Sequence, residues 1–465
     1  MSAENLFPYV PNHWRVTILG KLAKASGGDI QTGPFGSQLH ASDYVDDGIP
    51  SIMPKNISVD SVLTGDIARV SPDDVERLSK YKVQAGDIIY SRRGNIEKCA
   101  RITPKEDGWL CGTGCLRVRV LPGEVSTEYL HAYLCHPTVR EWIVRHAVGA
   151  TMLNLNTSIL NALPIVIPSK PEMVRIASIW LSISDKIQLN HQINQTLEQM
   201  AQAIFKSWFV DFEPVKAKIA ALKAGSSEEG TLFAAMQAIS GKDEAQLTRL
   251  QAEQYIELRG TAELFPSAMQ DSELGEIPEG WEPVRLDHFI ELAYGKALKK
   301  TSRVDGVYPV YGSGGITGIH NEFMISGPGI IIGRKGTVGS IYWEARAFYP
   351  IDTTYYVSIK NGCSLPFAYY LLQTLGLDGM NTDAAVPGLN RNNVYRLGVP
   401  SFPPEIVARF THIVGSIFRK MSAFNAETQS LIELRDTLLP KLLSGELSVS
   451  NAESQTAEAE ETAHV

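Results

Sequence analysis

The sequence predicts an α/β (α+β) protein with two similar globular domains, joined by two long helices that pack on each other as a coiled coil. An internal repeat supports this: residues 87–94 (DIIYSRRG) return as 329–336 (GIIIGRKG), and residues 11–14 (PNHW) return as 278–281 (PEGW). Each copy of the repeat is followed by a heptad pattern. Landmarks that recur in one order indicate duplicated domains related by a pseudo-twofold internal repeat.

The landmarks divide the chain into six predicted segments. These are a first domain at 1–170, a helical spacer at 171–223, an acidic helical connector at 224–275, a second domain at 276–403, a second helical spacer at 404–450 and a disordered acidic tail at 451–465. Within the first domain, short apolar runs at 87–90 and 116–121 predict strands, and residues 129–146 predict one helix.

The heptad patterns are the clearest structural signal. Apolar residues recur with a 4-3 spacing and two polar interruptions, and adding 234 to each number gives the second set: Ile176, Trp180, Ile183, Ile187, Asn190, Asn194, Leu197, Ala201, Ile204 and Trp208, then Phe410, Val414, Ile417, Met421, Phe424, Thr428, Leu431, Arg435, Leu438 and Leu442. One such stripe alone would favour a helix packed on its own domain, but two matching stripes favour a coiled coil. Asn194 and Thr428, at equivalent positions, would fix its register. Helices of about 35–38 residues make a rod of roughly 55 Å, long enough to act as a ruler between two domains.

Composition narrows the class of protein. With 465 residues, 44% hydrophobic and 20% charged, the chain resembles an ordinary globular protein of several domains. It has no apolar run long enough to span a membrane and no signal-peptide layout at its start. Its five cysteines form no even disulfide framework, so we expect a cytoplasmic protein. Cys111 and Cys115 have metal-like spacing, but no second Cys or His pair follows, so we expect no metal site.

The net charge of −8 is unevenly distributed. Residues 224–280 hold 3 basic and 11 acidic side chains, whereas residues 1–170 hold 18 basic and 17 acidic ones and residues 281–403 hold 11 and 9. The acidity therefore lies largely outside the repeated domains, which remain compatible with nucleic-acid binding.

Tests for catalytic motifs fail. Residues 312–317 (GSGGIT) have a threonine at the third glycine position of a dinucleotide-binding loop, so we predict a tight turn there. A phosphate-binding loop and the Asn/Asp-Pro-Pro-Tyr/Phe motif of amino-methyltransferases are both missing from the sequence. The chain is predicted to be noncatalytic and to bind no cofactor.

Polar loops shared by the two domains suit contact with double-stranded DNA. Arginine binds guanine bidentately, asparagine and glutamine bind adenine, and lysine neutralises phosphate. The candidate residues are Ser37, Gln38, Lys55, Asn56, Arg92, Arg93 and Asn95, followed by Tyr311, Ser313, Arg334, Lys335, Thr337, Arg391 and Asn392. Each of these residues, taken alone, could equally be an ordinary polar loop residue. The matched basic loops at 92–94 and 334–336, taken together, favour contact with DNA.

Four motifs give the chain a resemblance to the specificity subunits of type I restriction-modification systems. They are residues 32–39 (TGPFGSQL), 206–212 (KSWFVDF), 271–281 (DSELGEIPEGW) and 438–445 (LLPKLLSG). The resemblance covers about 8–450 and implies two target-recognition domains, each reading half of an asymmetric bipartite site. It also implies that the two long helices form an antiparallel coiled coil, which sets the gap between the half-sites.

The same resemblance implies that two adenine methyltransferase subunits dock on the helices and that nuclease-translocase subunits join them. S-adenosylmethionine, ATP and Mg would then belong to these partners. The candidate coiled-coil and docking residues are Ile183, Ile187, Asn194, Leu197, Trp208, Phe209, Ile417, Met421, Thr428, Leu431, Leu438 and Leu442. A coiled-coil scaffold that binds no DNA and a self-contained modification enzyme remain the alternatives.

Overall fold

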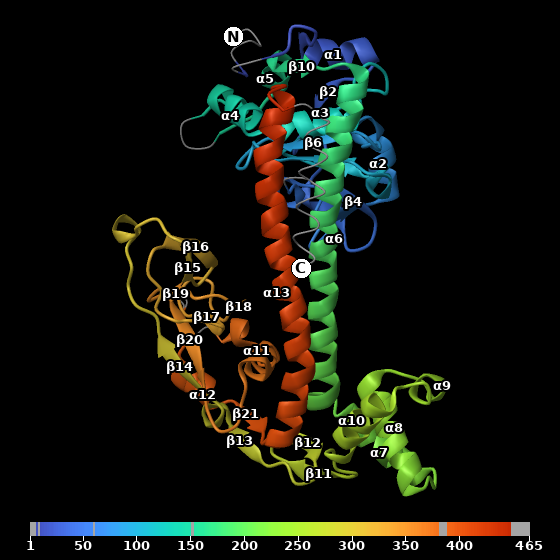
Figure 1. Ribbon diagram of the computed structural model, residues 1–465, viewed down its shortest axis with the longest axis vertical. Helices are drawn as coiled ribbons and strands as arrows, with labels where there is room; N and C mark the ends of the chain where they lie inside the picture. Colours follow the sequence, from blue (N-terminus) through green and yellow to red (C-terminus); the bar gives the residue numbers. More distant parts are fainter. Residues whose placement is uncertain (1–5, 8–9, 59–60, 150–152, 381–387, 448–465) are drawn as a thin grey trace. The chain divides into compact units, whose positions relative to one another are not determined.

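The computed structural model describes residues 6–7, 10–58, 61–149, 153–380 and 388–447. Contacts divide the chain into two compact units, residues 1–191 with 425–465 and residues 192–424. The helices α6 (Lys170–Phe209) and α13 (Pro404–Leu443) each contribute to both units (Figure 1). The predicted fold class is confirmed, and the predicted disordered tail lies outside the described residues. None of the helices in these described ranges is long and apolar enough to cross a membrane.

The first unit contains two four-stranded sheets with the orders β2-β9-β6-β7 and β3-β5-β4-β8, and β1 pairs separately with β10. Its strands are β1 (Arg15–Ile18), β2 (Ile30–Thr32), β3 (Tyr44–Val45), β4 (Ile49–Ile52), β5 (Ala68–Val70), β6 (Ile88–Ser91), β7 (Cys99–Arg101), β8 (Leu110–Cys111), β9 (Cys115–Val118) and β10 (Pro164–Ile167). Its short helices are α1 (Leu19–Ser26), α2 (Pro72–Arg77), α3 (Thr127–Leu134), α4 (Pro137–His146) and α5 (Thr157–Ala162).

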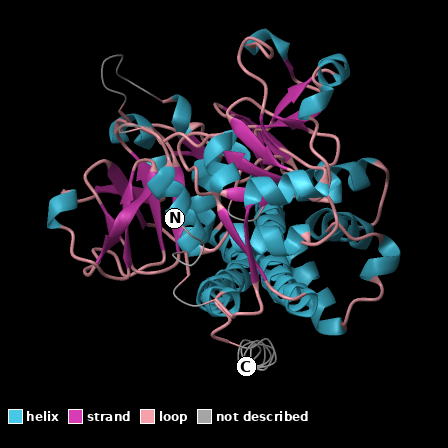
Figure 2. Cartoon of the chain, turned by 90° about the horizontal axis from the view of Figure 1, so that it is seen from above, coloured by secondary structure: helices cyan, strands magenta, loops and turns pink. Residues whose placement is uncertain are grey.

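The second unit repeats this plan. Its main sheet has the order β14-β20-β17-β18, a smaller sheet has the order β16-β15-β19, and β13 pairs with β21. Figure 2 shows the strands of the chain in magenta and its helices in cyan. The strands are β13 (Pro283–Arg285), β14 (Ile290–Tyr294), β15 (Tyr308–Gly312), β16 (Gly315–His320), β17 (Gly329–Gly333), β18 (Ile341–Glu344), β19 (Tyr349–Pro350), β20 (Thr354–Ile359) and β21 (Gly398–Pro400). The helices beside them are α11 (Leu365–Gln373) and α12 (Arg391–Tyr395).

Continuous apolar runs form the central strands. Every residue of β6 and β17 is buried, as expected when both faces of a strand are covered. The tight turn predicted at 312–317 joins β15 to β16, where Gly315 has a φ of +101°. The prediction of one helix over 129–146 is wrong. The chain breaks at His136, whose ring nitrogen accepts the N–H of Thr138 and caps α4, and Pro137 begins the new helix without an N–H group.

The heptad residues are buried or half-buried on both long helices, which confirms the predicted seam. In the first unit, Arg435 lies over the ring of Trp180, and the Asn190 amide donates to Glu427 (2.7 Å) and to Thr428 (3.4 Å). In the second unit, the Trp208 ring contacts the Phe410 ring. Rising numbers on α6 meet falling numbers on α13, so the helices are antiparallel.

The structure identifies the partner of Thr428. The buried amide that contacts Thr428 belongs to Asn190, one heptad position before Asn194. Asn190 is fully buried, and its donation to Thr428 and Glu427 satisfies the amide nitrogen within the first unit. A buried polar pair of this kind favours one register over its neighbours.

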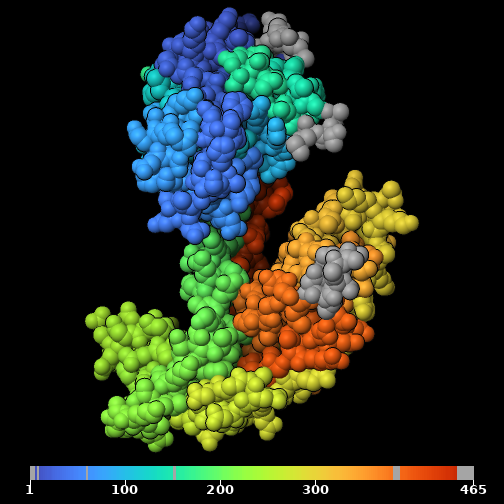
Figure 3. Space-filling model, turned by 180° about the vertical axis from the view of Figure 1, so that it is seen from behind, coloured from blue at the N-terminus to red at the C-terminus, as the bar shows by residue number. Residues whose placement is uncertain are grey.

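The region after the first long helix differs from the predicted spacer and connector. The 171–223 spacer is two helices, because Phe212 adopts a left-handed φ of +54° and separates α6 from α7 (Glu213–Lys223). Helices α8 (Glu228–Ser240), α9 (Glu244–Leu247) and α10 (Ala252–Glu263) follow α7 and form the yellow-green lobe in Figure 3. The hairpin of β11 (Met269–Ser272) and β12 (Gly275–Pro278) crosses the predicted boundary at residue 275.

Candidate nucleic-acid interface

The two units end their central strands in the same backbone arrangement. Arg92 follows β6, and its carbonyl accepts the N–H of Leu155 at 2.9 Å. Arg334 follows β17, and its carbonyl accepts the N–H of Leu389 at 2.8 Å. Equivalent arginines are therefore held at the same point of each sheet by a distant segment of the chain, as the sequence repeat predicted.

A glycine turn follows each arginine. Gly94 and Gly336 have left-handed φ angles of +76° and +88°, which L side chains rarely adopt. The carbonyl of each glycine accepts the N–H of the residue two positions on, Ile96 at 2.9 Å and Val338 at 3.0 Å. This turn reverses the chain beyond the strand and leaves Arg93 and Lys335 exposed.

Each arginine lies against an exposed aromatic ring. The guanidinium of Arg92 lies 5.9 Å from the ring centre of Phe35, which is 54% exposed. In the second unit, Arg334 and Arg391 lie 4.8 and 4.9 Å from the ring centre of Tyr294, which is 44% exposed. A guanidinium on an aromatic face is oriented by that face and still presents its N–H edge.

The candidate cations are electrostatically available. No ion pair within the described part of the chain includes the candidates Arg92, Arg93, Arg334, Lys335 or Arg391. By contrast, two hydrogen bonds of 2.6 and 2.7 Å join Arg119 to Asp87 and raise the pKa of this arginine. Glu344 pairs with Arg346 in the same way. Arginines and lysines that have no acidic side-chain partner are suited to contact phosphates and bases.

The remaining candidates lie in loops around these arginines or elsewhere on the same unit. Ser37, Lys55, Asn95, Thr337 and Asn392 are exposed, and Gln38 and Ser313 are half-buried. In the second unit, Ser340 donates to the carbonyls of Ser313 (2.5 Å) and Thr337 (3.0 Å), which brings these two candidate loops together. In the first unit, the Gln38 side chain accepts the Tyr81 hydroxyl at 2.8 Å and is therefore partly committed to the domain.

Two predicted contact residues are used inside the protein and are corrected. Asn56 is 1% exposed, with its amide bonded to Met53 (3.0 Å) and Leu63 (3.1 Å), so it stabilises a turn. Tyr311 is 6% exposed, and its hydroxyl donates to Glu344 at 3.0 Å. Burial, together with the neighbouring Glu344, raises the pKa of Tyr311. Neither side chain presents a polar group at the surface.

The predicted coiled-coil and docking residues lie in the interior of the protein. Trp208 and Phe209 are 1% and 3% exposed and pack in the core of the second unit with Phe265, Trp281 and Phe410. The other members are buried or half-buried: Ile183, Ile187, Asn194, Leu197, Ile417, Met421, Thr428, Leu431, Leu438 and Leu442. This burial agrees with a place in the coiled coil, and buried side chains offer no surface to a partner.

Two aromatic residues of the candidate interface were not predicted from the sequence. Phe35 lies in the 32–39 motif, and Tyr294 ends β14 beside three exposed lysines, Lys296, Lys299 and Lys300. An aromatic residue followed by closely spaced lysines was the signal that could have found the second group.

Comparisons with known proteins identify the family of the chain. Residues 41–199 and 278–400 match the family model of the type I restriction modification DNA specificity domain. The type I restriction enzyme HindI specificity subunit of Haemophilus influenzae is 30% identical over 415 residues, which cover 80% of this chain and 89% of that protein. The MjaIX specificity subunit of Methanocaldococcus jannaschii is 22% identical over 83% of this chain and 88% of its own length.

A solved structure is also similar. The S subunit of a type I restriction-modification system from M. genitalium has 18% sequence identity and a TM-score of 0.47, covering 92% of this chain and 96% of its own. The family match and the two repeated units define a DNA-specificity protein. The chain belongs to the family of type I restriction-modification specificity subunits, as its motifs predicted.

Proposed function

We propose that this chain directs a type I restriction-modification complex to its DNA site, and that each unit reads one half of a bipartite sequence. The observation that carries this proposal is the repeated arrangement of an uncompensated arginine on an exposed aromatic ring, once per unit. Family membership supports DNA as the ligand. A duplicated reader matches a ligand with two halves.

The half-sites should differ in sequence. The backbone around Arg92 and Arg334 is the same, but the ring beneath the guanidinium is Phe35 in one unit and Tyr294 in the other. Arg391 adds a second guanidinium to the Tyr294 ring. Different donors held in one backbone frame select different base edges, so the site is asymmetric.

The chemistry then belongs to partners. Two adenine methyltransferase subunits carrying S-adenosylmethionine bind the helix pair, and nuclease-translocase subunits with ATP and Mg join them. This chain supplies no catalytic group and binds none of these cofactors. Because the seam is buried, we assign docking to the outer face of α6 in the first unit, where Val174 and Leu189 are 56% and 47% exposed.

Adenine-methylation mapping tests the proposal. The chain is co-expressed with its partner methyltransferase subunits in a host that lacks the system, and the methylated genome is sequenced. We expect one asymmetric motif of two half-sites separated by a fixed gap. An unchanged methylome despite assembled, soluble partners would favour the scaffold alternative, and methyl transfer by the purified chain alone would favour a self-contained enzyme.

A further inference from the structure

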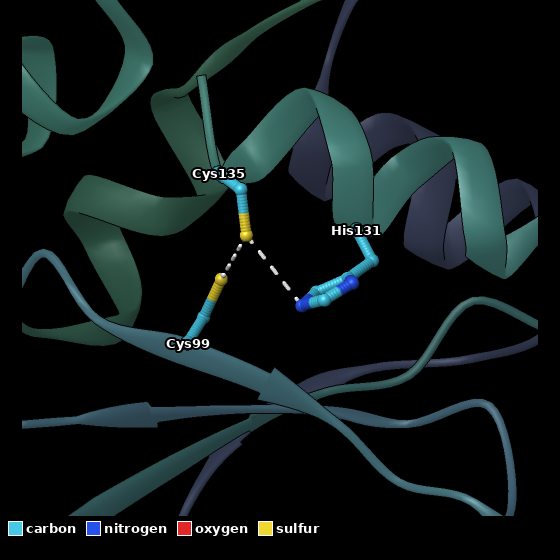
Figure 4. Close-up of side chains that lie close together, drawn as sticks. All are labelled: Cys99, His131 and Cys135. Carbon is cyan, nitrogen blue, oxygen red and sulfur yellow. Dashed lines mark hydrogen bonds between the residues drawn. The ribbon is translucent and has the colours of Figure 1, made fainter. Parts of the chain in front are cut away.

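The first unit contains a buried cluster of two cysteines and a histidine. Cys99 begins β7, His131 lies in α3, and Cys135 is the C-cap residue of that helix (Figure 4). They are 1%, 3% and 5% exposed. Among the described residues, this is the one group of three side chains that could hold a metal ion. Cys111 and Cys115, whose spacing resembled a metal motif, are buried elsewhere in the unit.

The distances within the cluster fit one metal ion. The Sγ atoms of Cys99 and Cys135 are 3.7 Å apart, and Cys135 Sγ lies 3.5 Å from His131 Nε2. All three ligand atoms lie within 4.8 Å of one another. Tetrahedral zinc, with bonds of about 2.3 Å to sulfur and about 2.0–2.1 Å to nitrogen, places two sulfurs about 3.8 Å apart and sulfur and nitrogen about 3.6 Å apart.

A divalent ion would also balance the charge of the site. Two bound thiolates carry two negative charges, and a buried charge needs a compensating partner.

An unpartnered polar group lies beside the cluster. Tyr90 on β6 is directly opposite Cys99 on β7, so their side chains share one face of the sheet. The Tyr90 hydroxyl is fully buried and has no hydrogen-bond partner of normal geometry among the described residues. It is available to a water or other ligand in a fourth coordination position.

We propose that Cys99, His131 and Cys135 bind one thiophilic metal ion, with Zn²⁺ as the favoured occupant. Two sulfur ligands and an imidazole exclude the oxygen-preferring Mg²⁺ and Ca²⁺. The ion is structural, because the site is closed to solvent. It ties β7 to the end of α3, next to the 92–98 loop that carries Arg92, Arg93 and Asn95. The inference does not depend on DNA reading, since a metal would stabilise this junction whatever the loop contacts.

Metal analysis of the purified full-length chain tests the site. We expect about one equivalent of Zn²⁺, falling to nearly none in Cys99→Ser, His131→Gln and Cys135→Ser variants. Cys111→Ser is the matched control, because Cys111 is an equally buried cysteine outside the cluster, and it should keep its zinc. Replacement of Zn²⁺ by Co²⁺ should give a thiolate-to-cobalt charge-transfer band, which depends on ligation and not on activity.

Two results would overturn the proposal. One is a folded, reduced wild-type chain that holds no zinc and gives no cobalt band after metal addition. The other is a Cys99–Cys135 disulfide in freshly purified protein, found by mass spectrometry, with no metal bound after reduction. Both measurements use the wild-type chain, so they remain decisive if a variant fails to fold. Either result would leave the DNA-reading proposal to be judged by methylation mapping alone.

Discussion

Replacing Arg334 by alanine tests the proposed DNA interface most directly. The guanidinium lies over Tyr294 and Tyr355, and its Nη1 donates to the carbonyl of Asp352 at 3.1 Å. Among the described residues, no hydrogen bond of Nε or Nη2 competes for the opposite edge of the guanidinium. Arg334 is therefore oriented for one bidentate contact, either to guanine or to a phosphate.

The two contacts predict different magnitudes. A bidentate base contact contributes about 1–3 kcal/mol, so its loss weakens binding to the specific site by about 5- to 150-fold. A phosphate contact contributes about 0.9 to the slope of log affinity against log salt. Over a fourfold rise in salt, its loss would change the fall in affinity by about 3.5-fold, on specific and nonspecific DNA alike.

The assay is DNA binding by the chain with its methyltransferase partners, measured across salt on the methylated motif and on a scrambled duplex. Arg334→Lys keeps the charge but loses the two parallel N–H donors of the guanidinium. This variant should therefore keep the slope of log affinity against log salt but lose base discrimination. Arg285→Ala is the matched control, because Arg285 is an exposed arginine of the same unit paired with Asp287 at 2.9 Å. A folded Arg334→Ala complex with unchanged affinity and slope would refute the interface.

Three further outcomes follow from the structure. Burial lowers the pKa of His136 to about 4, so the unfolded chain takes up a proton below about pH 6.5 while the folded chain does not, and stability is lost as pH falls toward 4. Between pH 7 and pH 5 we expect the free energy of unfolding, measured by chemical denaturation, to fall by about 2 kcal/mol because of His136. The His136→Asn variant keeps a capping side chain but has no group that titrates here, so its free energy of unfolding should fall by about 2 kcal/mol less than that of the wild type. An equal fall in both proteins would contradict this. The double variant Asn190→Leu with Thr428→Val should unfold at a denaturant concentration equal to or higher than that of the wild type. Asn190→Ala alone should lower the free energy of unfolding by about 1–3 kcal/mol, because it leaves buried polar groups without a partner. A double variant less stable than the wild type would show that the buried polar pair contributes to stability. A further variant adds seven residues between Leu197 and Ile204 and a matching heptad in the antiparallel partner helix. The gap between the half-sites of the methylated motif should lengthen by about three base pairs, and neither half-site should change. An unchanged gap would show that the length of the helices does not set the spacing.

The sequence was sufficient for the parts of the fold that depend on periodicity. A 4-3 apolar spacing buries one helix face wherever the helix lies, so the seam from Ile176 to Trp208 was predictable without tertiary information. The repeat likewise placed Arg92 and Arg334 at equivalent strand ends, because β6 and β17 are buried runs that end at a polar turn.

Other features depend on contacts between distant segments. Asn56 resembles an exposed loop amide until Leu63 closes a turn around it, and Trp208 resembles a docking residue until Phe265 and Phe410 cover it. The partner of Thr428 could not be assigned from the sequence, because Asn190 and Asn194 both fit the heptad and only the placement of α13 brings Asn190 to Thr428. These errors share one cause: the sequence gives the polarity of a residue but not its neighbours.

The repeat also explains why the proposed metal site occurs in one unit. Helices α3 and α11 begin at equivalent caps, Ser126 and Ser364, and each packs beside the edge strand of the main sheet, β7 or β18. In the second unit, Trp343 of β18 meets Tyr369 of α11 edge-on at 5.7 Å. Tyr90 pairs with Cys99, and the matching Ile332 pairs with Ile341, so an isoleucine lies in the second unit where Cys99 lies in the first. Tyr369 lies five residues after its cap Ser364, as His131 lies five residues after Ser126. The second unit therefore lacks these ligands, and a metal ion would join strand to helix in the first unit where the second unit uses side-chain contacts such as Trp343 with Tyr369.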